Sequence, residues 1–247
     1  MSGSNNPRRI ARRVAVKAMH RFGGEGKKGE EELAFWVDIW DKQIRDGALW
    51  GIGTLELSGD AEVAADYNGR RWQQARAEVN RVLEEAGIED KNFFAGKRVL
   101  DIGPGCVGFP DAAAEQAQIS FGLDPIADDY ARAGLLLEDS RAIYLHSGAE
   151  TIPLLGDTID VVVCRNALDH VVDPVGVVAE IRRVLSADGK LILNVDLDHP
   201  PSPTEPHEIS HKQLGKWLEG WTIDSERIDE RGHAGGGQAI VIVASPA

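Results

Sequence analysis

A glycine-rich turn follows a short apolar run near the middle of the chain. Residues 103–108 read Gly-Pro-Gly-Cys-Val-Gly and come directly after Val-Leu-Asp-Ile at 99–102. Glycine lacks a Cβ atom, so such a turn lets the backbone approach a ligand closely. A helix that begins behind the turn offers unpaired N–H groups. The spacing Gly-x-Gly-x-x-Gly is typical of cofactor binding, and it is shared by two classes of cofactor.

Two aspartates help to distinguish the two cofactor classes that such a turn can bind, dinucleotides and S-adenosylmethionine. Asp124 ends a second apolar run about 20 residues later, where a carboxylate can bind both ribose hydroxyls of either cofactor. Asp101 lies just before the first glycine, and its charge suits a sulfonium and an ammonium group better than a pyrophosphate. A Tyr-x-x-x-Lys pair would support hydride transfer, but Tyr130 is followed by Ala-Arg-Ala-Gly and so does not form one. The turn therefore favours S-adenosylmethionine, bound at Gly103, Pro104 and Gly105.

Polar side chains gather where later apolar runs end. Three imidazoles are candidates for the general base that a hydroxyl substrate needs, namely His170, His199 and His207. Four carboxylates would hold Mg²⁺ through oxygen if they converge, namely Asp169, Asp196, Asp198 and Glu205. His199 and His207 would instead favour a softer ion. The structural alternative is that His170 hydrogen bonds at a helix entry and that the acids cap helices and hold the loop.

The elements that must position these residues alternate between strand and helix patterns from Lys97 onward. This alternation predicts a parallel sheet covered by helices. Strands are expected at 98–102, 119–123, 142–145, 159–164 and 190–195, and the fully apolar run 159–164 is expected to be central. Helices are expected at 110–118, 127–137 and 174–185, the last with Asp173 as N-cap and Pro174 at its first position. Asp188-Gly189 predicts a turn, and strands near 221–229 and 238–243 predict a terminal hairpin.

Residues 1–95 show helical spacing at 31–45 and 61–86 and few strand signals. Trp36 and Trp40 lie four residues apart and thus on one helix face. That face either packs against the sheet or forms an aromatic wall of a substrate pocket, where flat rings suit sugars. We therefore divide the chain into a helical N-terminal extension or cap, residues 1–95, and a cofactor-binding domain, residues 96–247.

Composition bounds the class of protein. Hydrophobic residues make up 43% of the 247 residues, enough for a substantial core. The net charge of -13 argues against a nucleic-acid partner. The basic stretch 8–21 is expected to be a solvated face or a subunit contact, as in a homodimer; the alternative is a helix that contacts RNA or an anionic surface. A mean hydropathy of -0.24, without a long apolar run or secretory signal, predicts a cytoplasmic protein away from membranes. Cys106 and Cys164 are expected to be structural.

From Arg98 to Val195 the chain resembles class I S-adenosylmethionine-dependent methyltransferases. The motifs that carry the resemblance occur in the family's order, at Leu100–Gly105, Gly122–Pro125, Gly148–Leu154, Ile159–His170, Ile181–Leu185 and Asp188–Leu191. The resemblance implies an α/β fold with a doubly wound, mostly parallel seven-stranded sheet, and a cofactor across the carboxyl ends of the strands.

The resemblance also implies roles for single residues. Asp124, with Pro125, would bind ribose; Ala149 and Glu150 would flank adenine, and Asn166 would lie near the methionine part. Many relatives have an aspartate just before the Ala-Glu pair, where this chain has Ser147 and Gly148. The adenine amino contact is then expected from Ser147 or from the backbone of Ala149.

Two further segments resemble sugar O-methyltransferases of bacterial polysaccharide synthesis, among them the mycobacterial methylmannose polysaccharide 1-O-methyltransferase. They are the Glu-Glu-Leu-Ala-Phe-Trp run at 31–36 and the loop from Asp198 to His207. This resemblance implies an oligosaccharide or small-molecule acceptor methylated on a sugar hydroxyl. The alternatives are a quinone or natural-product methyltransferase, or a non-catalytic module that binds the cofactor.

Overall fold

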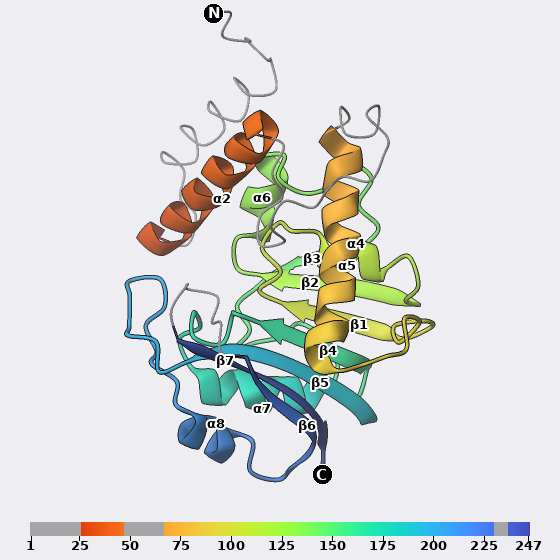
Figure 1. The fold of residues 1–247 in the computed structure, drawn as a ribbon, viewed down its shortest axis with the longest axis vertical. Coiled ribbons are helices and arrows are strands. Elements are labelled where there is room, and N and C mark those ends of the chain that lie inside the picture. Colours follow the sequence, from red (N-terminus) through yellow and green to blue (C-terminus); the bar gives the residue numbers. More distant parts are fainter. Residues whose placement is uncertain (1–25, 47–66, 230–236) are drawn as a thin grey trace, which may run out of the picture.

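The computed structural model describes residues 26–46, 67–229 and 237–247 (Figure 1). The basic stretch 8–21 and the first part of the helix predicted at 61–86 lie outside these ranges. The side chains of residues 40–46, 67 and 68 also lie outside the description. The shared face of Trp36 and Trp40 therefore stays a prediction.

Within these ranges, seven strands form one sheet in the order β3-β2-β1-β4-β5-β7-β6. The first five strands are parallel: β1 (Arg98–Ile102), β2 (Ile119–Asp124), β3 (Ile143–His146), β4 (Ile159–Arg165) and β5 (Leu185–Leu197). Beyond β5, β7 (Gln238–Pro246) and β6 (Trp221–Asp229) pair antiparallel. The predicted doubly wound, mostly parallel sheet is confirmed, with β4 central and the late antiparallel pair at one edge.

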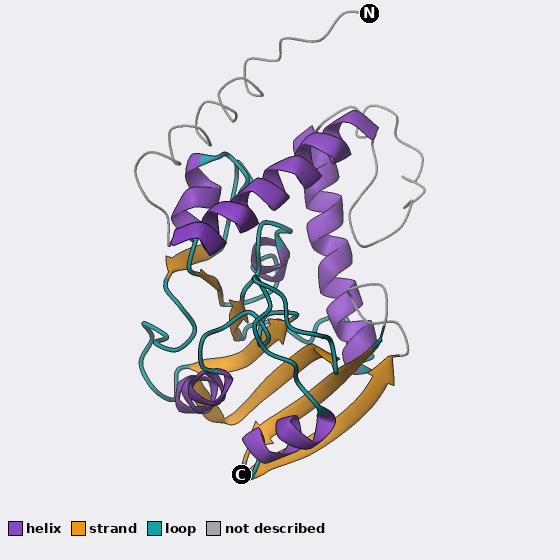
Figure 2. Ribbon diagram, turned by 90° about the vertical axis from the view of Figure 1, so that its left-hand side faces the viewer, coloured by secondary structure: helices purple, strands orange, loops and turns teal. Residues whose placement is uncertain are grey.

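Helices cover both faces of this sheet, as Figure 2 shows. α4 (Tyr67–Ala86) and α5 (Phe109–Ala113) pack on one face, and α7 (Pro174–Val184) and α8 (His211–Trp217) pack on the other. α2 (Gly26–Asp46) and α6 (Ala127–Arg132) pack together over Cys106 and Ile126, in the segments that follow β1 and β2.

The period of two along each strand explains the two cores. In β4, Val162 and Cys164 lie in the core under α7 and α8, whereas Val161 and Val163 lie in the core under α4 and α5. All four side chains are fully buried. Because both faces are covered, the run is apolar at every position, as a central parallel strand requires.

Helix α4 crosses the strands rather than following them (Figure 1). One side of the helix is apolar and packs in the core, through Ala75, Val79 and Val82. The adjoining side is polar at helical spacing. We call this side the polar flank of α4; it consists of Arg71, Gln74, Glu78, Arg81 and Glu85.

Two helices are shorter than the sequence predicts. α5 covers 109–113 instead of 110–118, because the chain continues in turns such as Glu115 N to Ala112 O at 3.1 Å. α6 covers 127–132 instead of 127–137, because Gly134 takes a left-handed φ of 65°. Leu135 N then donates to Tyr130 O at 2.8 Å, which is the pattern of a glycine-terminated helix.

Two smaller predictions around α7 and β5 also need correction. Asp173 is the N-cap residue of α7 and Pro174 follows it, but the Asp173 side chain makes no capping hydrogen bond. The turn at Asp188-Gly189 lies inside β5, which is longer than predicted. There the register jumps from Ile159↔Leu185 to Val161↔Lys190, so the extra residues bulge out of the β4–β5 ladder.

Both cysteines are free and buried. Burial raises the pKa of the Cys164 thiol, which disfavours a reactive thiolate. Among the helices that the structure describes, none has an apolar stretch long enough to cross a bilayer.

Candidate active site

The carboxyl ends of the five parallel strands meet at one edge of the sheet, which we call the site edge. The strand order reverses between β1 and β4, because the chain leaves β1 toward β2 and β3 and returns on the other side at β4 and β5. In open α/β sheets, ligands bind in the crevice at such a reversal. We therefore expect the residues that contact a ligand to lie near the ends of β1 and β4.

The glycine-rich turn leaves β1 at this reversal. Gly103 and Gly105 both have left-handed φ values, 65° and 55°, which strain other residues. A Cβ atom at Gly103 would lie 2.6 Å from the Cβ of Ala167, in the segment after β4. A Cβ at Gly105 would lie 2.6 Å from the Trp36 ring of α2. The turn is thus held closely between the segment after β4 and α2.

Asp101 lies under this turn and is 5% exposed. Burial raises the pKa of its carboxyl group well above the ordinary value; the charge of Arg165 opposes this rise, and the charges of Glu78 and Asp124 add to it. Ionisation of the Asp101 carboxyl group therefore costs more free energy in the ligand-free protein than in water. A cation placed beside it would lower that cost.

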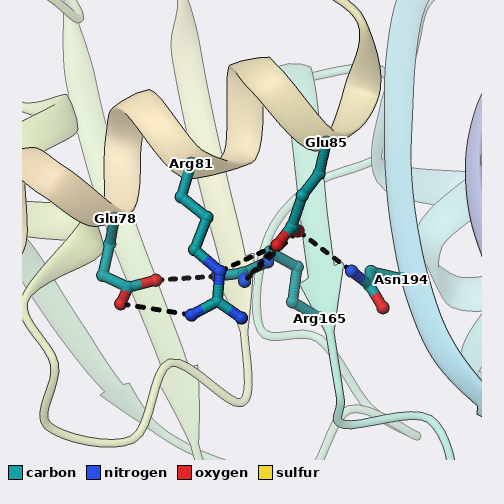
Figure 3. A network of polar contacts seen from close by, with 5 residues as sticks. All are labelled: Glu78, Arg81, Glu85, Arg165 and Asn194. Carbon is teal, nitrogen blue, oxygen red and sulfur yellow. Dashed lines mark hydrogen bonds and ion pairs between the residues drawn. The ribbon is translucent and has the colours of Figure 1, made fainter. Parts of the chain in front are cut away.

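A network of polar side chains joins α4 to the ends of β4 and β5 (Figure 3), and the charges of its Arg165 and Glu78 act on Asp101. Arg165, at the end of β4, binds Glu78 at 3.1 Å and Glu85 at 3.3 Å. Asn194 of β5 donates to Glu85 at 3.0 Å, and Arg81 binds Glu85 at 2.8 Å. Burial works to raise the pKa of Glu85, but Arg165 and Arg81 outweigh it and the pKa is lowered.

The sequence did not single out these network residues. The signal was present in α4 as charged residues at i, i+3 and i+4 spacing, but that pattern also occurs on solvated helices. Contacts with Arg165 and Asn194, 80 and 109 residues from Glu85 in the chain, place Glu78 and Glu85 in the interior instead.

The predicted adenosine contacts lie at the ends of β2 and β3. Asp124 is buried, and its Oδ1 accepts from Ile126 N at 3.0 Å, which orients the carboxylate. Pro125 is half-buried and Ala149 is buried. Glu150 accepts from Val172 N at 2.7 Å, so it joins the segment after β3 to the segment after β4.

Two other predicted cofactor contacts lie close by. Ser147 donates to the carbonyl of Thr151 at 2.9 Å, so its hydroxyl hydrogen has a partner within its own loop. Asn166 has a left-handed φ of 46°, and its N–H donates to Asn194 O at 2.8 Å. This strained residue ends the β4–β5 ladder next to the crevice, and strained backbone is common at functional sites.

Three of the predicted catalytic and metal residues come together, Asp169 and His170 from the segment after β4 and Glu205 from the loop after β5. One donor atom from each of Asp169, His170 and Glu205 lies within 4.8 Å of the others. Asp169 is 4% exposed and its Oδ1 has no hydrogen-bond partner among the described residues; neither has either ring nitrogen of His170. Burial raises the pKa of Asp169, opposed by the charge of His170. We call these three residues the Asp-His-Glu cluster.

The other candidates of this set surround the cluster. His199 Nδ1 lies 3.5 Å from Glu205 Oε2, whereas His207 Nε2 lies 2.8 Å from the carbonyl of Val171 and must donate to it. Asp196 is buried in β5, and its charge acts on Asp169 from outside the cluster. Asp198 is exposed with a φ of 53°, and its backbone N–H bonds Ile209 O.

Comparison with known proteins agrees with this geometry. Residues 100–193, which span β1 to β5, match the model of a family described as a methyltransferase domain. Over 146 residues the chain is 33% identical to the ubiquinone biosynthesis O-methyltransferase of Pseudomonas aeruginosa, covering 54% of this chain and 62% of that enzyme. It is 30% identical over 127 residues to the uncharacterized methyltransferase YcgJ of Bacillus subtilis, covering 50% of each. The chain thus spans half to three-fifths of these relatives.

Solved structures show the same fold. A putative methyltransferase from Bacillus halodurans superposes with a TM-score of 0.57 at 16% identity, covering 69% of this chain and all of that one. The [4+2]-cyclase SpnF superposes with a TM-score of 0.55 at 18% identity, covering 70% of this chain and 81% of that one. The fold is therefore the Rossmann-like methyltransferase fold, and by itself it does not decide the reaction.

The matched domain and the fold together support a class I S-adenosylmethionine-dependent methyltransferase. The glycines of the turn, the orienting bond at Asp124 and the buried acid at Asp101 fit that cofactor. The relatives named above do not extend this support to a sugar acceptor.

Proposed function

We propose that this protein transfers a methyl group from S-adenosylmethionine to a hydroxyl group of a small molecule. The observation that carries the proposal is the Asp-His-Glu cluster, whose Glu205 lies in the loop after β5 and whose Asp169 and His170 lie in the segment after β4, beside the cofactor turn. Ala167 joins the two, since its Cβ lies where a Cβ of Gly103 would clash, two residues before Asp169.

The cofactor supplies an electrophilic methyl group on its sulfonium. Asp101, Gly103, Pro104 and Gly105 would hold its methionine end, together with Asn166. Asp124, Pro125, Ala149 and Glu150 would hold its adenosine. Alignment of the acceptor with the methyl group can then provide much of the rate.

A hydroxyl acceptor needs a base or a metal ion to become nucleophilic. His170 is the base that the geometry favours, because Glu205 lies 3.6 Å from its Nε2 and can stabilise the imidazolium. His199 lies on the other oxygen of Glu205 and is the second candidate, and His207 orients the segment through Val171.

The same cluster fits a divalent cation. Asp169 and Glu205 of the predicted magnesium set belong to it, Asp196 lies behind it, and Asp198 is exposed. Because His170 takes part, the donors suit Mn²⁺ or Zn²⁺ better than the all-oxygen preference of Mg²⁺. The unpartnered Oδ1 of the buried Asp169 gives such an ion its anchoring ligand.

Two acceptor classes follow from different observations. The sugar hydroxyl follows from the segments at 31–36 and 198–207 in the sequence. A phenolic hydroxyl of a quinone precursor follows from the ubiquinone-biosynthesis relative. The homodimer, the cytoplasmic location and the absence of nucleic-acid and membrane partners remain predictions from sequence.

The test is transfer of labelled methyl from S-adenosylmethionine to a panel of mannosides and catechol-type phenols, with EDTA and with Mn²⁺, Zn²⁺ or Mg²⁺ added back. We expect transfer to one class of hydroxyl, lost in the His170→Ala variant. Loss with EDTA and recovery with Mn²⁺ or Zn²⁺ identifies the metal route, and insensitivity to EDTA identifies the base. Cofactor binding without transfer to any hydroxyl would contradict the proposal and favour the non-catalytic module.

A further inference from the structure

Gln74 is a fully buried amide without a hydrogen-bond partner. Its side chain is 0% exposed, and neither Oε1 nor Nε2 has a partner among the residues that the structure describes. A primary amide can donate two hydrogen bonds and accept two. Buried polar groups in native proteins are nearly always paired, so an unpaired one calls for an explanation, and a missing ligand is one.

The neighbours of Gln74 on the polar flank place it beside the cofactor turn. Arg71, three residues earlier, donates to the carbonyl of Cys106 at 3.4 Å, within the turn. Glu78, four residues later, binds Arg165 at the end of β4 and acts electrostatically on Asp101 at the end of β1. Residues three and four apart share one helix face, so Gln74 faces the site edge between these two anchors.

A second contact indicates where Gln74 lies relative to the glycine-rich turn. A Cβ atom on Gly108, the last glycine of the turn, would lie 3.0 Å from the Cβ of Ala75, the residue after Gln74. Helix α4 therefore lies directly against the turn at this level. The amide of Gln74 is held on the same stretch of helix.

The charges next to Gln74 indicate what kind of ligand group belongs there. The carboxylates of this region are four, Asp101, Asp124, Glu78 and Glu85, against three guanidinium groups, Arg71, Arg81 and Arg165. One positive charge is therefore lacking when all seven groups are ionised. An ammonium group beside Asp101 supplies that charge, and an amide can donate to a carboxylate carried on the same carbon atom.

We propose that Gln74 binds the α-amino-acid end of S-adenosylmethionine, with Nε2 donating to the carboxylate while Asp101 pairs with the ammonium group. Gln74 is then a positioning residue for the cofactor. It fixes the methionine arm, and through that arm the direction of the methyl group toward the Asp-His-Glu cluster. This inference rests on the cofactor named in the proposed function.

Three ligands separate the parts of the cofactor in calorimetric binding to the purified full chain. S-adenosylhomocysteine has the whole amino-acid end, decarboxylated S-adenosylmethionine lacks only the carboxylate, and 5′-methylthioadenosine lacks the entire end. The variant is Gln74→Leu, of nearly equal volume without polar atoms. The matched control is Gln73→Leu, the same change one residue earlier on the same helix.

Gln74→Leu is expected to weaken S-adenosylhomocysteine binding about tenfold, the loss of one good hydrogen bond to a charged group. Binding of 5′-methylthioadenosine and of the decarboxylated cofactor should stay within about twofold of wild type. The melting temperature without ligand should be unchanged or higher, because a buried unpaired amide has been removed. Gln73→Leu should change none of these values.

Three results would overturn the proposal: unchanged affinity for S-adenosylhomocysteine, an equal loss for all three ligands, or a lower melting temperature of the free Gln74→Leu protein than of the control. A wild-type protein that binds none of the ligands would instead overturn the proposed function. The two failures are thus distinguished before any variant is made.

Discussion

Arg98 and Asp160 lie where β1 and β4 begin, and their polar groups satisfy one another. Asp160 accepts from the backbone N–H of Arg98 at 2.8 Å and from its guanidinium at 2.9 and 2.5 Å. The opposite ends of the same two strands carry Asp101, with a raised carboxyl pKa, and Arg165, held in a buried network, next to the strained Asn166. The strands thus begin at one mutually satisfied pair, and they end at a buried acid that is costly to ionise and at an arginine whose Nε has no partner among the described residues.

This difference indicates which edge is built for a ligand. Unpaired buried groups lower the stability of the free protein and are retained where binding satisfies them. Substitutions at the two edges should therefore have opposite signatures. Changes at the site edge should separate stability from binding, while changes at the opposite edge should affect stability alone.

The largest stability effect is expected from Arg165→Met. It leaves the buried Glu78 without its nearer guanidinium partner and removes one of the two guanidinium groups on the half-buried Glu85, which costs about 3–5 kcal/mol in the free energy of unfolding. The matched change at the other edge, Arg98→Met, removes a partly exposed pair and should cost about 1 kcal/mol. Urea denaturation measures both. Equal losses of unfolding free energy in the two variants would contradict the proposed difference between the two edges.

His170→Ala should lower the rate of methyl transfer by about 10²–10³, because the acceptor hydroxyl loses its base or a metal ligand. The free energy of unfolding should change by less than about 1 kcal/mol, since the ring nitrogens have no hydrogen-bond partner to lose. His211→Ala, on an exposed ion pair with Glu226, is the control and should retain full activity. Activity of His170→Ala above a tenth of wild type would remove the cluster from the mechanism.

Asp101→Asn should raise the free energy of unfolding and lower the affinity for the cofactor. The folded-state pKa of Asp101 is raised, so the native state holds its proton more tightly than the unfolded state, and wild-type stability falls as the pH rises above about 4. The variant lacks this loss and should be about 1–2 kcal/mol more stable at pH 8 than wild type, with little difference at pH 4. Its affinity for S-adenosylhomocysteine should fall about tenfold. A variant less stable at pH 8 would mean that the charge of Asp101 supports the fold.

Asp160→Asn should have the smallest effect and the opposite pH dependence. The hydrogen bonds from Arg98 lower the pKa of Asp160 to about 2. Its stabilising contribution is therefore complete above about pH 4 and is lost as the pH falls toward 2. We expect the variant to be about 1 kcal/mol less stable at pH 7, with the difference vanishing near pH 2, in thermal or urea unfolding. An effect on cofactor affinity would contradict the separation of the two edges.

Local signals in the chain determined the elements of the sheet. The apolar runs at 98–102 and 159–164 predict strands because alternation and burial follow from side chains within the same segment. The glycines of the turn predict a backbone approach to a ligand because glycine adopts the left-handed φ found at 103 and 105 without the strain that a Cβ atom adds. The helix of 127–132 was predicted too long, although Gly134 was a local stop signal.

Tertiary structure alone decided which polar groups became partners. The sequence does not distinguish among the four candidate metal-binding carboxylates, Asp169, Asp196, Asp198 and Glu205. The fold brings Asp169 and Glu205 to His170, whereas Asp196 is buried in β5 and Asp198 is exposed. Glu78 and Glu85 resemble a solvated helix face until α4 crosses the sheet and meets Arg165 and Asn194. The physical reason is range: strands and turns arise from neighbouring residues, whereas partners of buried charges are chosen by packing between segments far apart in the chain.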